Sequence, residues 1–233
     1  MTPKDQECSD FFDGLSEEYE TTVRQGTGVV AGNDDYLCRY KVEIAKEICP
    51  DAEKIMDFGA GIGLSQKYLH EQFPKSTYFA TDTSKQSLNL LKKRYPNVTV
   101  KETQKVFNED LNAYDLIFVS CVFHHIEPKS RGQVLCSLVK CLKHQGSLII
   151  FEHNPYNPLT QLVVKTSPID KGVKLLKMSE LLQMGNQLEN VSCNGAYTVF
   201  FPSFMKKLRK LEKSKLKHVK LGAQYYVHLQ NLG

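Results

Sequence analysis

The sequence lacks a long hydrophobic run: it contains no stretch of about 18 or more consecutive apolar residues. A helix that crosses a membrane needs about 20 mostly apolar residues, so we expect no membrane span. The first residues, Met1 to Glu7, are polar and acidic and lack the basic and apolar regions of a secretory signal. Together these absences predict a cytoplasmic protein.

A metal-binding or disulfide pattern of cysteines is also missing. The seven cysteines are scattered, and no two of them have the C-x-x-C spacing. An odd, unpatterned set is typical of free thiols in a reducing compartment and argues against structural zinc. Internal repeats, low-complexity segments and linkers are absent as well. We therefore expect one domain over residues 1–233.

Neither sign of charge is in large excess, because 30 basic and 26 acidic residues leave a net charge of +4. This charge does not call for a nucleic-acid partner. One basic run extends from Lys206 to Lys220, and Phe204, Leu208 and Leu211 lie at helical spacing just before and within it. A solvated amphipathic helix is the simpler interpretation, and a patch for RNA, acidic lipid or a phosphorylated substrate is the alternative. No recognition motif with interleaved aromatic residues supports RNA.

The most informative feature present is a glycine-rich turn, since residues 55–63 read IMDFGAGIG. A buried strand here leads into a turn where backbone amides can approach a polar ligand. A dinucleotide-binding turn has the spacing G-x-G-x-x-G, but Leu64 stands where its third glycine would be. The acid ahead of the glycines, Asp57, suits a ligand with a positive end. The turn therefore disfavours a nicotinamide cofactor.

A carboxylate follows the next expected strand, because Asp82 stands at the end of the run 77–81. About 20 residues past a glycine turn, such a carboxylate is placed to accept hydrogen bonds from both ribose hydroxyls of an adenosyl ligand. Asp82 and Ser84 could instead cap the following helix, and both roles are compatible.

The order Asp-x-Gly-x-Gly-x-Gly resembles motif I of the class I S-adenosylmethionine (SAM)-dependent methyltransferases. Residues 114–117 (YDLI) and 120–126 (SCVFHHI) are similar to the fourth-strand segment of that family, and Phe11-Phe12-Asp13 with Tyr19 to its amino-terminal segment. Residues 151–160 (FEHNPYNPLT) and 167–170 (SPID) resemble a bacterial subgroup with an HNPxNPLT segment. The resemblance implies SAM as cofactor and S-adenosyl-L-homocysteine (SAH) as product.

Alternating helix and strand patterns predict an α/β protein with a parallel sheet. The resemblance makes this a Rossmann-like methyltransferase fold, a mostly parallel seven-stranded sheet with an antiparallel last strand. We expect strands at 54–58, 77–81, 97–100, 114–119, 146–151, 191–200 and 224–229. We expect helices at 36–49, 64–72, 84–94, 130–142, 158–165, 179–184 and 203–217. Residues 1–36 are expected to cap the cofactor, and residues 154–178 to form a substrate lid.

The expected cofactor-binding residues follow from the turn, the carboxylate and the resemblance. They are Asp57, Gly59, Ala60, Gly61, Gly63, Asp82, Thr83, Thr103, Ser120 and Tyr19. The chain departs from the family after the third strand, where many relatives have Asp-Ala facing the adenine and residues 101–104 here read KETQ. Thr103 or Gln104 is the candidate adenine contact.

Three histidines follow the expected strands four and five, where ligands of open α/β sheets bind. Imidazole titrates near neutral pH and can take a proton from a hydroxyl acceptor. We order the candidate bases His153, His124, His125, with a structural hydrogen-bonding role as the alternative for each. Glu152 could anchor the cofactor side or the turn that follows it.

These features predict a SAM-dependent methyltransferase that acts on a small molecule by in-line displacement. The resemblance, rather than the residues themselves, implies that the methylated atom is oxygen. No acidic cluster suggests a metal, so none is expected. The alternatives are an RNA or protein methyltransferase that uses the basic run, and a non-catalytic SAM-binding regulatory module. The sequence does not define the oligomeric state.

Overall fold

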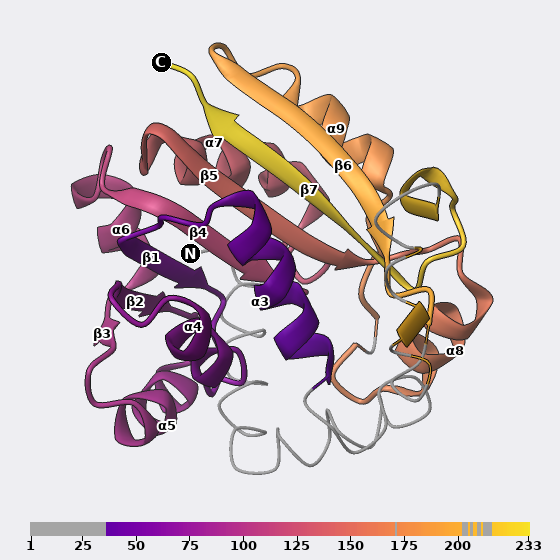
Figure 1. The fold of residues 1–233 in the computed structure, drawn as a ribbon, viewed down its shortest axis with the longest axis horizontal. Helices are drawn as coiled ribbons and strands as arrows, with labels where there is room; N and C mark the ends of the chain where they lie inside the picture. The colour runs from indigo at the N-terminus through magenta and orange to yellow at the C-terminus, as the bar shows by residue number, and fades with distance from the viewer. Residues whose placement is uncertain (1–35, 171, 202–204, 206, 209–210, 212–215) are drawn as a thin grey trace.

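The computed structural model describes residues 36–170, 172–201, 205, 207–208, 211 and 216–233. Seven strands form one sheet in the order β3-β2-β1-β4-β5-β7-β6, with helices on both faces (Figure 1). The pairs among β1 to β5 are parallel, whereas β7 is antiparallel to both β5 and β6. The predicted α/β class and mostly parallel seven-stranded sheet are confirmed.

The strands are β1 (Lys54–Phe58), β2 (Thr77–Thr81), β3 (Thr99–Val100), β4 (Tyr114–Ser120), β5 (Leu142–His153), β6 (Val191–Thr198) and β7 (Gln224–Asn231). The α-helices are α3 (Tyr36–Ile48), α4 (Gln66–Gln72), α5 (Lys85–Arg94), α6 (Thr103–Glu109), α7 (Arg131–Lys140), α8 (Pro158–Thr166) and α9 (Met178–Gly185). Two short 3₁₀ turns are η1 (Pro128–Ser130) and η3 (Leu216–His218).

Two hydrophobic cores lie on the two faces of the sheet. Helices α3, α4 and α5 cover one face, and α6, α7 and α9 cover the other (Figure 1). Successive strand residues alternate between these cores: Ile55 packs with the first set of helices and Met56 with the second. Strands buried on both faces need apolar side chains at every position, which explains the continuous apolar runs in the sequence.

Strand directions bring the functional segments to one edge of the sheet. The carboxyl ends of β1, β2, β4 and β5 share this edge because these strands are parallel. Strand β7 runs the other way, so it begins at the same edge, with Gln224 paired to His153. The glycine turn, the histidines and the start of β7 therefore lie along one rim.

Most predicted elements are confirmed, and the exceptions have local causes. Helix α6 was not predicted. It is only seven residues long and has one fully buried residue, Val106, so its sequence shows little hydrophobic periodicity. Strand β5 begins at Leu142 rather than Gly146, where a register shift and the positive φ of Gln145 interrupt the ladder. Helix α9 has Lys177 as its N-cap, so the prediction that Ser179 caps this helix was wrong by two residues.

Other predictions fall partly or wholly outside the described residues. They concern the cap segment 1–36 and most of the basic helix 203–217, of which the structure describes η3 and a few single residues. Among the described helices, none is both long and apolar enough to cross a membrane.

Candidate active site

The glycine turn after β1 is a compact backbone loop beside the end of β2. The amides of Gly59 and Ala60 both donate to the Thr81 carbonyl, at 2.8 and 3.0 Å, and Gly63 donates to the Ala60 carbonyl at 2.9 Å. Gly59 has a φ of +70°, and a Cβ placed there would lie 2.4 Å from a methyl of Val122. Only glycine fits this position, so the turn packs directly against the segment after β4.

Asp57 ends up buried at the base of this turn, with 3% of its surface exposed. Its Oδ2 accepts a hydrogen bond of 2.7 Å from Nε2 of Gln66. Burial raises the pKa of Asp57 to about 7; the Gln66 bond partly offsets this rise, and the charge of Asp82 adds to it. A cationic group beside Asp57 would stabilise its ionised form.

Asp82 faces the glycine turn from the end of β2. Its Oδ2 accepts from the Gly61 amide at 2.8 Å, and its Oδ1 accepts from the Ser84 amide at 2.9 Å. Ser84 is the N-cap of α5, with its side chain accepting from the Ser87 amide. Asp82 therefore shapes both the turn and the start of the helix, whereas its neighbour Thr83 is exposed.

The remaining predicted cofactor residues lie at three places. Thr103, the first residue of α6, shares a hydrogen bond of 2.7 Å with the hydroxyl of Thr81. Ser120, the last residue of β4, accepts a hydrogen bond of 2.8 Å from Nζ of Lys41. Tyr19 lies outside the described residues. Thr103 and Ser120 are thus tied to the strand ends that flank the glycine turn.

The buried Lys41 and the half-buried Cys121 form a polar pair next to Ser120. Lys41 is 4% exposed, and its Nζ lies 3.3 Å from Sγ of Cys121. Burial alone would raise the pKa of Cys121, but Lys41 and His153 outweigh it and hold the pKa at about 6. The pair therefore favours a thiolate beside an ammonium at neutral pH.

His124 is clamped between two carboxylates. Its Nδ1 lies 2.6 Å from Oε2 of Glu152, and its Nε2 lies 3.2 Å from Oδ1 of Asp170. The other oxygen of the buried Glu152 accepts from the Phe123 amide at 2.7 Å. Burial opposes the charge on His124, but Glu152 and Asp170 raise its pKa to about 10. His124 is therefore an imidazolium that donates from both nitrogens.

His125 lies in a different electrostatic environment from its neighbour. Its Nε2 is 3.6 Å from Oδ1 of Asp170, but burial and the positive His124 lower its pKa to about 3. One potential ligand atom from each of His124, His125 and Asp170 lies within 4.8 Å of the others, a spacing that a metal ion could bridge. An ion there would have to displace the proton that His124 shares with Asp170.

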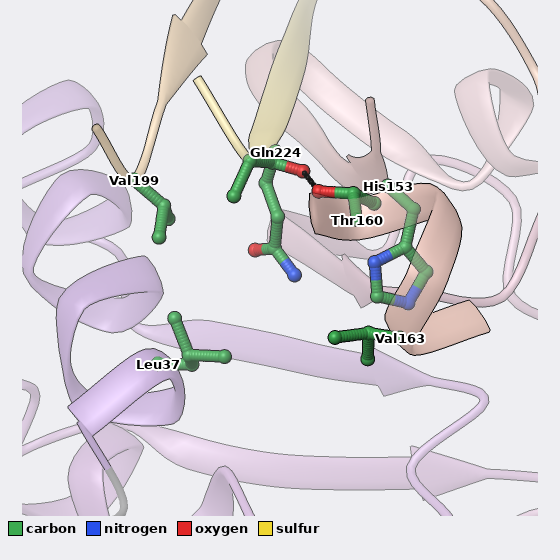
Figure 2. A pocket seen from close by; sticks show the side chains of 7 residues that line it. Leu37, His153, Thr160, Val163, Val199 and Gln224 are labelled. Carbon is green, nitrogen blue, oxygen red and sulfur yellow. Dashed lines mark hydrogen bonds between the residues drawn. The ribbon is translucent and has the colours of Figure 1, made fainter. Parts of the chain in front are cut away.

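His153 faces a small cavity at the end of β5. The cavity has a volume of about 30 Å³ and lies between α3, α8 and the start of β7. In Figure 2 the His153 ring and the Gln224 carboxamide both project into it. Apolar side chains form most of the remaining wall: Leu37, Val163, Val199 and Ala223.

The residues after β5 are anchored to the rest of the rim. Besides the Asp170 contact, Arg131 donates to the Lys174 carbonyl at 2.7 Å, and the Tyr225 hydroxyl donates to the Leu176 carbonyl at 2.7 Å. Asn157 is the N-cap of α8 and accepts from the Thr160 amide at 3.0 Å, as its sequence position predicts. Asp170 thus contacts both histidines, and Lys174 is linked to them through Arg131, which also donates to the His124 carbonyl.

Comparison with known proteins agrees with this geometry. Residues 56–148 match the family model of a methyltransferase domain. A SAM-dependent methyltransferase from Archaeoglobus fulgidus has a similar structure, with a TM-score of 0.65 at 13% identity over 85% of this chain and 95% of that one. The fold is that of the SAM-dependent methyltransferases. No curated protein matches the chain significantly.

Two further methyltransferase structures cover nearly the whole chain. One is titled a possible histamine N-methyltransferase from Thermotoga maritima, with a TM-score of 0.65 at 14% identity over 94% of this chain and 98% of that one. The other is the plantazolicin methyltransferase BpumL in complex with a triazolic desmethylPZN analog and SAH, with a TM-score of 0.60 at 15% identity over 99% of each chain. The family model ends at residue 148, whereas these two structures are similar to the chain as far as β6 and β7.

Sequence reasoning missed several polar residues at the rim of this methyltransferase fold. They are Lys41, Gln66, Cys121, Asp170 and Gln224, which received no role. Asp170 stands in a segment that the subgroup resemblance includes, and this was a usable signal. Lys41 gave none, because a lysine on an amphipathic helix is normally solvated.

Proposed function

We propose that this protein is an enzyme that uses SAM to methylate a small-molecule acceptor at an oxygen atom. The observation that carries the proposal is the glycine turn between Asp57 and Asp82, inside the segment that matches a methyltransferase domain. The cofactor assignment is also supported by similar structures that contain SAH.

The residues around the turn suit a ligand with a cationic end. Asp57 is a buried carboxylate, and the adjacent Oε1 of Gln66 is a buried acceptor without a hydrogen-bond partner among the described residues. An ammonium group beside them would stabilise the charge of the Asp57 carboxylate and donate a hydrogen bond to Oε1 of Gln66. We assign to the cofactor Asp57, Gly59, Ala60, Gly61, Gly63, Asp82, Thr83, Thr103, Ser120 and Tyr19. When bound, SAM supplies an electrophilic methyl group.

Among the three histidines, His153 is our candidate general base. His124 already holds protons on both nitrogens between Glu152 and Asp170, so it cannot accept another. His125 has a pKa held near 3, which makes it a weak base. His153 lines the cavity, where its imidazole can take the proton of an acceptor hydroxyl as the oxygen is methylated.

We also propose the arrangement around this site. Residues 1–233 form a single domain in which 1–36 cover the cofactor and 154–178 form the substrate lid. The chain would act in the cytoplasm, as its unpatterned free cysteines suggest. We assign no metal to the reaction: in the candidate metal cluster among the described residues, both nitrogens of His124 already take part in hydrogen bonds.

Methylation of nitrogen is the second candidate, because one structure of the same fold is titled a possible histamine N-methyltransferase. A neutral amine acceptor needs no base before transfer, so the two candidates differ in their dependence on His153. A substrate bound by the basic run, RNA or protein, is a third candidate. It predicts that replacing Lys206, Lys207 and Lys210 by Gln abolishes transfer, whereas a small-molecule enzyme keeps it.

The proposal is tested by incubating the protein with isotopically methyl-labelled SAM and metabolite extract, and identifying labelled products by mass spectrometry. We expect a labelled small molecule whose fragments place the methyl group on oxygen. A label on nitrogen would establish the second candidate, and label only on RNA or protein the third. SAH binding without any labelled product would point to a regulatory module.

A further inference from the structure

A buried carboxamide reaches into the cavity beside His153 without a full set of hydrogen bonds. Gln224 is 3% exposed, and its Oε1 accepts no hydrogen bond from the residues that the structure describes. A buried acceptor without a hydrogen bond destabilises the folded protein unless a ligand or water satisfies it. Figure 2 shows the carboxamide projecting between His153 and Leu37. The atom is therefore placed where a bound molecule can reach it.

The backbone that carries Gln224 is held rigidly. The carbonyl of the preceding residue, Ala223, accepts from the Asn154 amide at 3.0 Å and from the Thr160 hydroxyl at 2.8 Å. The side chain of Asn154 donates to the carbonyls of Lys220 and Gly222 at 3.0 and 2.7 Å. In the sheet, Gln224 pairs with His153, which places their two side chains on the same face.

The contact of the amide nitrogen of Gln224 sets the orientation of the carboxamide. Its Nε2 lies 3.7 Å from Sγ of Cys121, the sulfur that Lys41 also contacts. A sulfur next to an ammonium is electron-rich and attracts the amide N–H groups rather than the amide oxygen. The oxygen is consequently the end of Gln224 that is turned away from Cys121 and left for a ligand.

The composition of the cavity wall favours a neutral ligand over an anionic one. Its wall is apolar apart from His153, Gln224 and Thr160, and the Thr160 hydroxyl already donates to the Ala223 carbonyl. None of the described residues that line it is a lysine or an arginine. The volume of about 30 Å³ exceeds the roughly 10–15 Å³ that one water molecule needs. A small neutral group therefore fits the cavity, whereas a carboxylate or phosphate would be repelled by the electron-rich oxygen of Gln224.

We propose that Gln224 is the specificity-determining residue of the acceptor pocket: its Oε1 accepts a hydrogen bond from a neutral O–H or N–H group of the acceptor. This donor is a second one, distinct from the hydroxyl that gives its proton to His153. The acceptor class is then a neutral, largely apolar molecule with two hydrogen-bond donors, of which one is methylated. The identity of the bound molecule as the methyl acceptor, and the hydroxyl that gives its proton to His153, rest on the proposed function; the preference of Gln224 for a neutral hydrogen-bond donor does not.

The test compares isopropanol with acetone, two molecules of similar size that differ in the O–H donor. Each is titrated into the full-length protein in the presence of SAH, while NMR follows the methyl signals of Val163 and Val199 and the side-chain amide of Gln224. We expect isopropanol to shift these signals with an affinity about 2- to 10-fold higher than acetone, as one added hydrogen bond allows. Gln224→Met, which keeps the length of the side chain, should abolish the difference.

Gln187→Met is the matched control, because Gln187 is exposed in the connection between α9 and β6. It should keep the isopropanol preference. Equal shifts by the two molecules in the wild-type protein, or stronger binding of acetone, would overturn the proposal without any variant. A preference that persists in Gln224→Met would overturn it as well. Because no methyl transfer is measured, failure here is distinct from failure of the proposed enzyme activity.

Discussion

Replacing Glu152 by Gln should strongly destabilise the protein, because it removes one partner of a buried ion pair. Glu152 is completely buried and its Oε2 lies 2.6 Å from Nδ1 of His124. The new amide can still accept from the Phe123 amide, but it leaves the imidazolium of His124 without its inner carboxylate. Breaking a buried pair in this way costs about 3–5 kcal/mol of unfolding free energy.

The destabilisation should depend on pH in a defined direction. The pKa of His124 is raised from 6.5 to about 10, so its contribution is complete below pH 6.5 and is lost as the pH rises towards 10. The pKa of Glu152 is lowered from 4.5 to about 2, so its contribution is complete above pH 4.5 and is lost as the pH falls. The difference between wild type and Glu152→Gln should therefore be largest between pH 4.5 and 6.5.

Urea unfolding at pH 6 and pH 9, followed by circular dichroism, measures this difference. Glu127→Gln is the control, since Glu127 is paired 3.4 Å from the exposed Lys129 and should change stability by less than about 1 kcal/mol. The reasoning is refuted if Glu152→Gln costs less than about 1 kcal/mol at pH 6, or if its cost is the same at both pH values.

Four further outcomes are expected. Asp82→Asn should weaken SAH binding by about 1.5–3 kcal/mol in calorimetry, whereas the exposed Asp51→Asn should not; unchanged affinity would remove Asp82 from the site. Because the pKa of Asp57 is about 7, SAH should bind roughly tenfold more weakly at pH 6 than at pH 8, and a flat profile would exclude Asp57. His153→Gln should lower turnover by roughly 10²–10⁴-fold while SAH affinity is kept; near-normal turnover would leave alignment alone as the mechanism. Chelation by EDTA should leave turnover unchanged, since both nitrogens of His124 are already engaged, and lost turnover restored by a divalent ion would contradict this.

Much of the fold could be predicted because local patterns and tertiary packing agree. The boundaries of β1 and β2 match the sequence prediction, since apolar runs between turn residues define buried strands. Helix α6 and the early start of β5 could not be predicted. The first has too few apolar positions, and the second depends on pairing with β4 across a register shift.

The candidate site was predictable where a motif fixes the backbone and not where distant side chains meet. The glycine spacing implied a tight turn, and the structure has one. The clamp on His124 joins residues from β5 and from the segment after α8, and no pattern within either segment indicates the other. The same holds for Gln224, whose partner Cys121 lies 103 positions away.

The central claim is that the cofactor of this chain is SAM and not NAD. Isothermal titration calorimetry with SAH and with NAD, on wild type and Asp82→Asn, tests it most directly. The account predicts that SAH binds to the wild-type protein, that Asp82→Asn weakens this binding, and that NAD gives no heat of binding. Binding of NAD without binding of SAH would contradict the account.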